Sequence, residues 1–166
     1  EIGVPEYTED EVKFAQALYD SYEMKDDSLP GAATEEDPDI YAYVDEKSCH
    51  GTKPINDFIV PYLYSEKPRM GSTDVGDVSY CAPTAQCYYA AGALGTGGHT
   101  WQMAAQSCSP LGFKGMLAAA AAMALAGARA AADPALLALA REQHAQSCPD
   151  GYTCPMPENA VPAYVE

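Results

Sequence analysis

An apolar run at residues 84–91 lies between two glycine-punctuated loops and constrains the fold more than any other stretch. The loop before it carries two carboxylates, Asp74 and Asp77, and the loop after it, 95–98, leads directly to His99. A short apolar run bounded by glycines is typical of a buried strand. Polar side chains on loops at the end of such a strand are where α/β proteins place their chemistry. This stretch predicts an α/β fold with a candidate site at the rim of its sheet.

The length and charge of the chain limit its partners. Its 166 residues are enough for one ordinary core, so one domain or part of one is expected. Acidic residues outnumber basic ones by 24 to 9, which gives a formal net charge of −15. Binding to nucleic acid or to an anionic membrane requires a basic surface, and this composition does not supply one. The acidity itself favours solubility.

Three helices are predicted from their capping residues. Thr8 and Glu11 form a capping box, and apolar residues at helical spacing continue this helix to about Met24. A Ser-Pro pair and an Asp-Pro pair begin two further helices, at 110–132 and 134–146. The first of these is alanine-rich, and alanine lets neighbouring backbones approach closely. It is therefore predicted to pack tightly against a sheet or another helix.

Other segments are predicted to be extended or irregular. Residues 25–53 are rich in Asp, Glu, Pro and Gly, which predicts a long acidic surface loop with a possible short strand at 41–44. The run 56–63 resembles a buried strand interrupted by Pro61. Residues 100–106 are ambiguous between an extended segment and a helical turn, and the extended form is favoured.

The cysteines and the apolar runs indicate a soluble cytoplasmic protein. The six cysteines lack a zinc-type pair and no secretory signal opens the chain, which favours reduced, mostly buried thiols. Cys148 and Cys154 flank a Pro-Asp-Gly turn, so a local disulfide between them stays an alternative. The apolar run 116–128 is shorter than a bilayer span and is ended by Arg129, which disfavours a membrane protein.

His99 is the strongest candidate for chemistry. Two glycines precede it, so another group can approach its backbone, and neutral imidazole is a common zinc ligand. One histidine is not a complete site, however, because a metal needs three or four ligands. Asp74 and Asp77 are candidates for metal ligation, for orienting His99 or for acid/base work, and both could instead cap turns. The residues around His99 form the candidate substrate pocket: Gly97, Gly98, Thr100 and Trp101. The alternative for Trp101 is that it simply packs against the protein.

Three motifs give the chain a family resemblance. GSTDVGDVSY at 71–80, APTAQ at 82–86 and GTGGHTWQ at 95–102 resemble the C-terminal signature of the peptidase M-twenty family of metal-dependent amidohydrolases. The likeness continues in FAQALYDSY, KPINDFIVPY, FKGMLAAA and YTCPMPENAVP, and so covers essentially the whole chain. The resemblance implies the C-terminal half of a three-layer α/β/α zinc-peptidase-like catalytic domain, with a central sheet and packed Ala-rich helices. Residues 1–166 match neither the family's N-terminal half nor its inserted lid, which carries the dimer interface.

The resemblance also implies a reaction and roles for residues. Family members hydrolyse the amide bond of N-acyl or N-aroyl amino acids, for instance an aminobenzoyl-glutamate, with two divalent ions, Zn or Mn. His99 matches the last metal-ligand histidine, and Asp74 and Asp77 match acidic residues near the metal site. The general-base glutamate belongs to the missing N-terminal half, so no catalytic residue is expected within this chain. Gly98, Thr100 and Tyr80 depart mildly from the family pattern.

These implications lead to two hypotheses about function. In the first, the chain is part of a metal-dependent amidohydrolase that works only with the N-terminal half of the same domain, forms a homo-oligomer through the lid and acts on a small N-acyl amino acid. The isolated chain is then expected to be inactive. In the second, it is a non-catalytic fragment or subunit that acts as a protein-interaction module.

Overall fold

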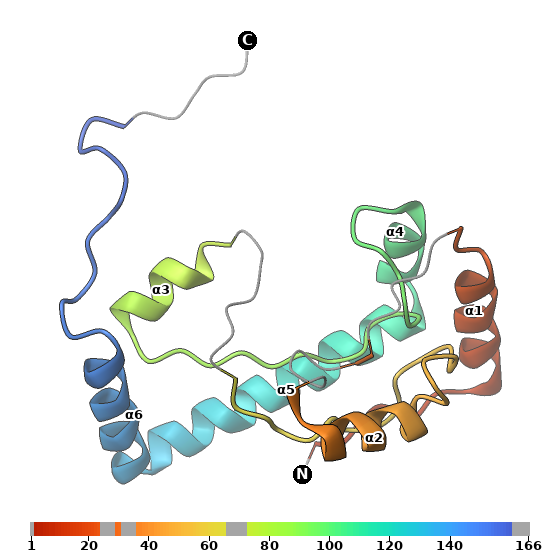
Figure 1. Cartoon of the computed structure of the whole chain (residues 1–166), viewed down its shortest axis with the longest axis horizontal. Helices are drawn as coiled ribbons and strands as arrows, with labels where there is room; N and C mark the ends of the chain where they lie inside the picture. The colour runs from red at the N-terminus through yellow and green to blue at the C-terminus, as the bar shows by residue number, and fades with distance from the viewer. Residues whose placement is uncertain (1, 24–28, 31–35, 66–72, 161–166) are drawn as a thin grey trace. The chain divides into compact units, whose positions relative to one another are not determined.

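The structure is a computed structural model and describes residues 2–23, 29–30, 36–65 and 73–160. The elements in these ranges are helices joined by turns and extended segments (Figure 1). In chain order they are α1 (Glu9–Asp20), α2 (Pro38–Lys47), α3 (Val75–Cys81), α4 (Trp101–Ser107), α5 (Pro110–Ala132) and α6 (Pro134–Ser147).

The predicted α/β fold with a central sheet is wrong, because the described part of the chain contains no strand. The runs 56–63 and 84–91 are extended, yet neither forms a hydrogen-bonded ladder, and side chains 84–88 are exposed. Near these runs, one isolated bond joins the Leu94 N–H to the Pro54 carbonyl oxygen at 2.8 Å. An extended run becomes a strand only where another backbone pairs with it, and an apolar pattern cannot show that partner.

Two further segments are helical where extended or irregular chain was predicted. Helix α2 lies inside the range 25–53, where the Asp37 side chain accepts bonds from the N–H groups of Asp39 and Ile40 at 2.9 and 3.1 Å. Helix α4 replaces the extended segment predicted at 100–106, and its N-cap, Thr100, accepts from the Met103 N–H. In both cases a side-chain cap satisfies N–H groups that the first turn leaves unpaired. Residues 25–28 and 31–35 lie outside the described ranges.

The three helices predicted from their caps are confirmed. The capping box of α1 is complete, because the Thr8 N–H donates to Glu11 Oε2 at 2.6 Å and the Glu11 N–H donates to Thr8 Oγ1 at 3.3 Å. The helix ends at Asp20, before the predicted end at Met24, which lies outside the described residues. Helices α5 and α6 begin where predicted, and Asp133 caps α6.

The chain divides into two compact units. Unit 1 comprises Glu1–Pro68 and Cys87–Leu125, and unit 2 comprises Arg69–Gln86 and Ala126–Glu166. Helices α1, α2 and α4 belong to unit 1, helices α3 and α6 belong to unit 2, and α5 has residues in both.

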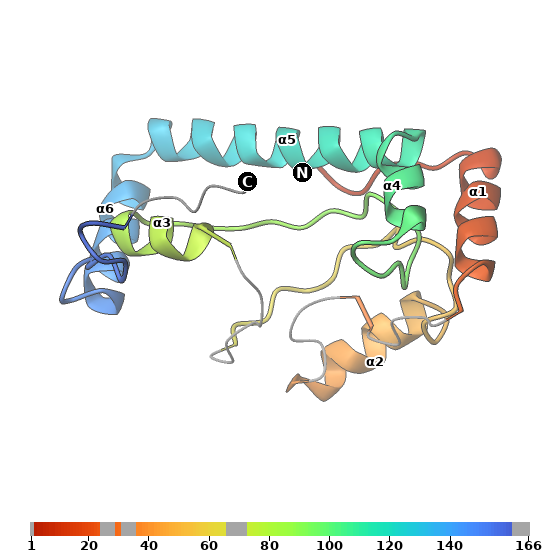
Figure 2. The ribbon, with the colours of Figure 1, turned by 90° about the horizontal axis from the view of Figure 1, so that it is seen from above.

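Unit 1 has a small apolar core where α1 meets the beginning of α5. In Figures 1 and 2, α1 and α4 both lie beside the first turns of α5. The approach is close at Gly115, because a Cβ built there would lie 2.3 Å from the Ala90 carbonyl oxygen, so glycine is required. The buried cluster contains Ala15, Leu18, Ile55, Ala93 and Leu111, with Tyr7, Phe14 and Tyr22 packed against it.

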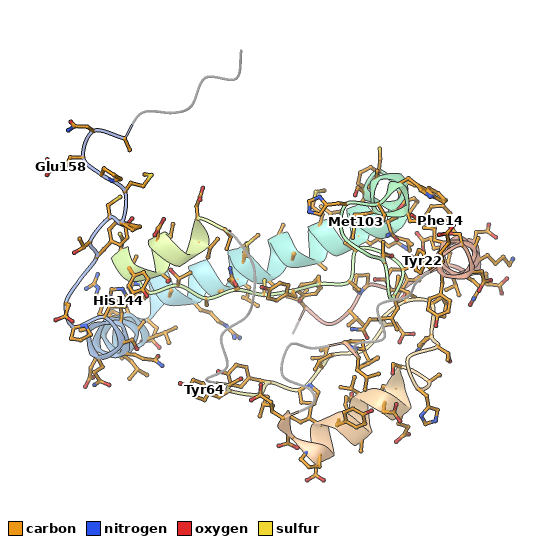
Figure 3. The ribbon with its side chains drawn as sticks, turned by 45° about the horizontal axis from the view of Figure 1, so that its top comes forward. Phe14, Tyr22, Tyr64, Met103, His144 and Glu158 are labelled. Carbon is orange, nitrogen blue, oxygen red and sulfur yellow. The ribbon has the colours of Figure 1, made fainter. Side chains whose placement is uncertain are left out.

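In unit 2, α3 contacts both α6 and the segment that follows α6. Neither α3 nor α6 buries a side chain completely. His144, labelled in Figure 3, bonds through Nε2 to the Ser79 carbonyl oxygen at 3.1 Å, which joins α6 to α3. The rings of Tyr80 and Tyr152 lie 6.3 Å apart between centroids.

Helix α5 has the predicted bounds but is more exposed than predicted. The apolar run 116–128 was expected to be too short for a bilayer, but the whole helix of 23 residues is long and apolar enough to cross one by length and composition. Helices in the core of soluble proteins can be equally long and apolar. Its buried residues, however, are limited to Leu111, Gly112 and Gly115, so the predicted tight packing holds only for its first turns.

Candidate functional site in the glycine loop before α4

His99 lies in unit 1, in the glycine-rich loop that leads into α4, and its side chain is exposed. Its φ of 60° is in the left-handed region, which costs a non-glycine residue on the order of 1 kcal/mol. Cys49 and His50 share this conformation, so the strain alone does not mark a site. The loop is closed by Thr100, whose hydroxyl donates to the Gly97 carbonyl oxygen at 2.9 Å while it caps α4. The imidazole is thus presented at the surface by a tied turn.

A buried polar network holds the base of this loop. Gln106, on α4, is only 1% exposed, and its Oε1 accepts from the Ala93 N–H at 2.6 Å. Its Nε2 donates to Thr96 Oγ1 at 2.9 Å. The Thr96 hydroxyl donates to the Ala93 carbonyl oxygen and also bonds to the Tyr22 hydroxyl. Because a hydroxyl has one proton, Tyr22 is the donor in that bond.

The network joins α1, α4 and the loop. Figure 3 labels Tyr22, just after α1, and Met103 on α4, the two helices that it connects. Gln102 adds a bond from its Nε2 to Ser21 Oγ at 3.4 Å. At Gly92 a Cβ would lie 2.5 Å from the Gln106 amide carbon, so glycine is required for the amide to lie against the backbone. Satisfied polar groups in a buried site fix its geometry, so this network positions the loop.

The sequence interpretation missed Tyr22, Thr96 and Gln106. The available signal was the spacing of Gln102 and Gln106, which puts both amides on one face of a helix. That signal was hidden because residues 100–106 were interpreted as extended. Once α4 is recognised as a helix, two glutamines on its buried side indicate a polar network.

Asp74 and Asp77 are in unit 2, whereas His99 is in unit 1, so neither unit by itself contains both the carboxylates and the imidazole. Asp74 is the N-cap residue of α3 but its side chain makes no capping bond, and Asp77 lies in the first turn. Both side chains are exposed. A hydrogen bond to Cys154, some burial and the nearby negative charge of Asp77 raise the pKa of Tyr152 to about 12.

The described residues do not fit a complete metal centre. Within the ranges that the structure covers, no group of three or more His, Cys, Asp and Glu residues is arranged to hold a metal ion. Zinc requires three or four protein ligands, so His99 alone does not suffice. The two divalent ions that the resemblance implies stay a prediction, and no chemical step is derived through them.

The predicted substrate pocket is not enclosed by the described residues. Gly97 and Gly98 are exposed, Thr100 caps α4, and the Trp101 side chain is 64% exposed. A shallow, open depression in unit 1 is formed by other residues, none of them from the glycine loop. They are Ile2, Val4, Pro5, Glu6, Lys114, Leu117 and Ala118.

All six cysteines are free, so the alternative of a bond between Cys148 and Cys154 is not realised. Cys148 is half-buried and the other five are exposed, which corrects the expectation of mostly buried thiols.

Comparison with known proteins gives one informative match. No family model matches the chain, and no solved structure matches it. The chain is 32% identical over 166 residues to one subunit of the p-aminobenzoyl-glutamate hydrolase of Escherichia coli (strain K12). The match covers 97% of this chain but 34% of that protein, so the chain spans about a third of the length of the relative. The resemblance that the motifs indicate is thereby confirmed: nearly the whole chain is similar to one third of a p-aminobenzoyl-glutamate hydrolase polypeptide.

Proposed function

We propose that this chain forms part of a hydrolase that cleaves the amide bond of N-acyl or N-aroyl amino acids of the aminobenzoyl-glutamate type. The observation that carries the proposal is the identity of 32% to a hydrolase polypeptide across 97% of the chain. Two thirds of that relative have no counterpart here. Activity is proposed to need polypeptide equivalent to those two thirds, which we call the complementary segment.

Within this proposal His99 supplies one ligand to a divalent ion, Zn or Mn. Its exposed imidazole, on a loop tied by Thr100 and by the Gln106 network, supports the role, because a metal ligand must be accessible and held in place. The remaining ligands and the general-base glutamate come from the complementary segment. Asp74 and Asp77 are proposed to lie near the metal, and the pocket residues around His99 to contact the substrate. Homo-oligomerisation and a cytoplasmic location, where thiols stay reduced, complete the proposal.

The test is His99→Ala in the chain assembled with the complementary segment of the E. coli protein. Losing a ligand should lower metal affinity at least as much as the roughly 10–100-fold lost when a ligand's supporting partner is removed. Hydrolysis of aminobenzoyl-glutamate should fall in parallel. His50→Ala is the matched control, because His50 is also exposed, in unit 1 and at positive φ. Unchanged metal content and rate in the His99 variant would refute the ligand assignment.

The alternative is a non-catalytic protein-interaction module. It is supported by the lack of a metal-binding group among the described residues and by the many large apolar side chains left exposed. Metal content separates the two functions. The hydrolase proposal expects one or two ions per assembled site, whereas an interaction module binds the complementary segment without acquiring an ion.

A further inference from the structure

Helix α5 has two apolar faces, and only one of them is covered within unit 1. Leu111 and Gly115 face the core. The opposite side carries large side chains at helical spacing that are 48–63% exposed. We call this side the outer face of α5, and its residues are Phe113, Met116, Leu117, Ala120 and Met123, all in unit 1.

The composition of α5 shows that this exposure is unusual. No charged or polar side chain occurs between Lys114 and Arg129. A helix on the surface of a soluble protein normally carries polar residues on its outward side, and a helix that is apolar all round is normally buried all round. Contiguous exposed apolar surface of this kind marks an interaction site.

A depression beside the outer face offers an anchoring point. Leu117 and Ala118 form one wall and Ile2, Val4 and Pro5 form another, so its lining is mainly apolar. Lys114 also lines it, and its Nζ donates to the Glu6 carbonyl oxygen and to Glu11 Oε2, each at 2.7 Å. The charge of Lys114 is therefore already paired. An open apolar depression next to exposed aliphatic residues suits one inserted apolar side chain of a protein partner.

A bilayer fits this helix poorly as the occupant. The uncharged stretch 115–128 contains 14 residues and spans about 21 Å, which is shorter than a hydrocarbon core of about 30 Å. Burying more of the helix would bring Lys114 into lipid and break its bonds to Glu6 and Glu11. Docking against a protein surface requires neither the burial of Lys114 nor the loss of its bonds to Glu6 and Glu11.

The match to the hydrolase polypeptide indicates which protein surface covers the outer face of α5. Almost the whole chain, α5 included, is similar to a part of a protein that is about three times as long. We infer that the outer face of α5 and the adjoining depression dock an apolar surface of the complementary segment. This inference deepens the proposed function and rests on it for the identity of the partner.

The test measures the affinity of this chain for the complementary segment of the E. coli protein. Leu117→Glu places a charge in the lining of the depression and should weaken binding at least about tenfold. Met123→Glu, elsewhere on the same face, should weaken binding in the same direction. Ile59→Glu is the matched control, because Ile59 is also in unit 1 and is 62% exposed against 63% for Leu117. It should change the affinity less than twofold. Circular dichroism checks that each variant keeps its helices.

Each outcome decides for or against the docking site. Binding that the Leu117 and Met123 variants weaken selectively supports it even if the complex neither holds metal nor hydrolyses an amide, and then only the proposed function fails. Hydrolysis by the assembled proteins that neither variant affects overturns the docking site and leaves the function standing. The docking site is also overturned if no complex forms, or if Ile59→Glu weakens binding as much as the Leu117 and Met123 variants do. If the chain binds phosphatidylcholine vesicles and Leu117→Glu abolishes this binding, the outer face of α5 is assigned to a membrane. If the chain alone forms a concentration-dependent dimer and Leu117→Glu abolishes it, the face is assigned to a second copy. Either result would overturn the docking site for the complementary segment.

Discussion

At the scale of single residues, Gln106 is central to the candidate site. One side-chain amide satisfies the Ala93 N–H and the Thr96 hydroxyl, and both belong to the loop that presents His99. The imidazole itself is exposed and makes no contribution to the core. The position of His99 therefore depends on a buried residue on the next helix.

Gln106→Leu should destabilise the chain, because it leaves the buried Ala93 N–H without a partner and removes one of the hydrogen bonds at the Thr96 hydroxyl. An unsatisfied buried group of this kind costs about 1–3 kcal/mol. The free energy of unfolding in urea measures the effect. Gln143→Leu, at an exposed position on α6, is the control and should change it by less than about 0.5 kcal/mol. Equal losses in the two variants would contradict the network.

The ion pair between Glu11 and Lys114 gives a prediction for acid pH. The hydrogen bond from Lys114 lowers the pKa of Glu11 below its ordinary value of 4.5. A carboxyl whose pKa is lower in the folded state stabilises the fold above the unfolded value, and this stabilisation is lost as the pH falls through the folded value.

Stability should therefore fall from neutral pH to below pH 4 more steeply in the parent chain than in Glu11→Gln, in which the group cannot titrate. Glutamine can still complete the capping box, so helix α1 should persist. Thermal melts at several pH values measure the difference, with Glu9→Gln as a control in the exposed first turn. Parallel pH profiles for Glu11→Gln and the parent would rule out the role of this pair.

At the scale of elements, local capping signals correctly predicted α1, α5 and α6, whereas α2 and α4, which also begin with side-chain caps, were not predicted. An Asp-Pro pair like the one that correctly predicted α6 also begins α2, at Asp37. The acidic composition around Asp37 led to the interpretation of that segment as a loop. The predictions of strands are wrong for a different reason. A strand needs a paired neighbour, and the apolar run at 84–91 carries no information about whether one exists.

Two glycines in α5 should respond to alanine in opposite directions. Gly127 has open space around its Cβ position, so Gly127→Ala should stabilise the helix by about 0.5–1 kcal/mol. Gly115→Ala would place a methyl group against the Ala90 backbone and should be destabilising in spite of the same helix preference. Urea unfolding of both variants is the measurement. Stabilisation by both would show that the contact between α5 and residues 90–91 does not form.

At the scale of the whole chain, the sequence motifs correctly indicated the relative, while the fold expected from it did not appear in the described residues. The motifs depend on short local strings such as GTGGHTWQ, which a single sequence displays in full. A sheet and a metal centre depend on groups far apart in the polypeptide. The one predicted ligand, His99, and the two aspartates lie in different units, so no composition or spacing could show whether they meet.

The proposed function makes this chain part of an amide hydrolase that works only with the complementary segment. The most direct test assays hydrolysis of aminobenzoyl-glutamate by the chain alone, by the complementary segment of the E. coli protein alone, and by the two together. Hydrolysis is expected only when both are present. Hydrolysis by the chain alone, or a stable complex of the two that never cleaves the amide bond, would contradict it.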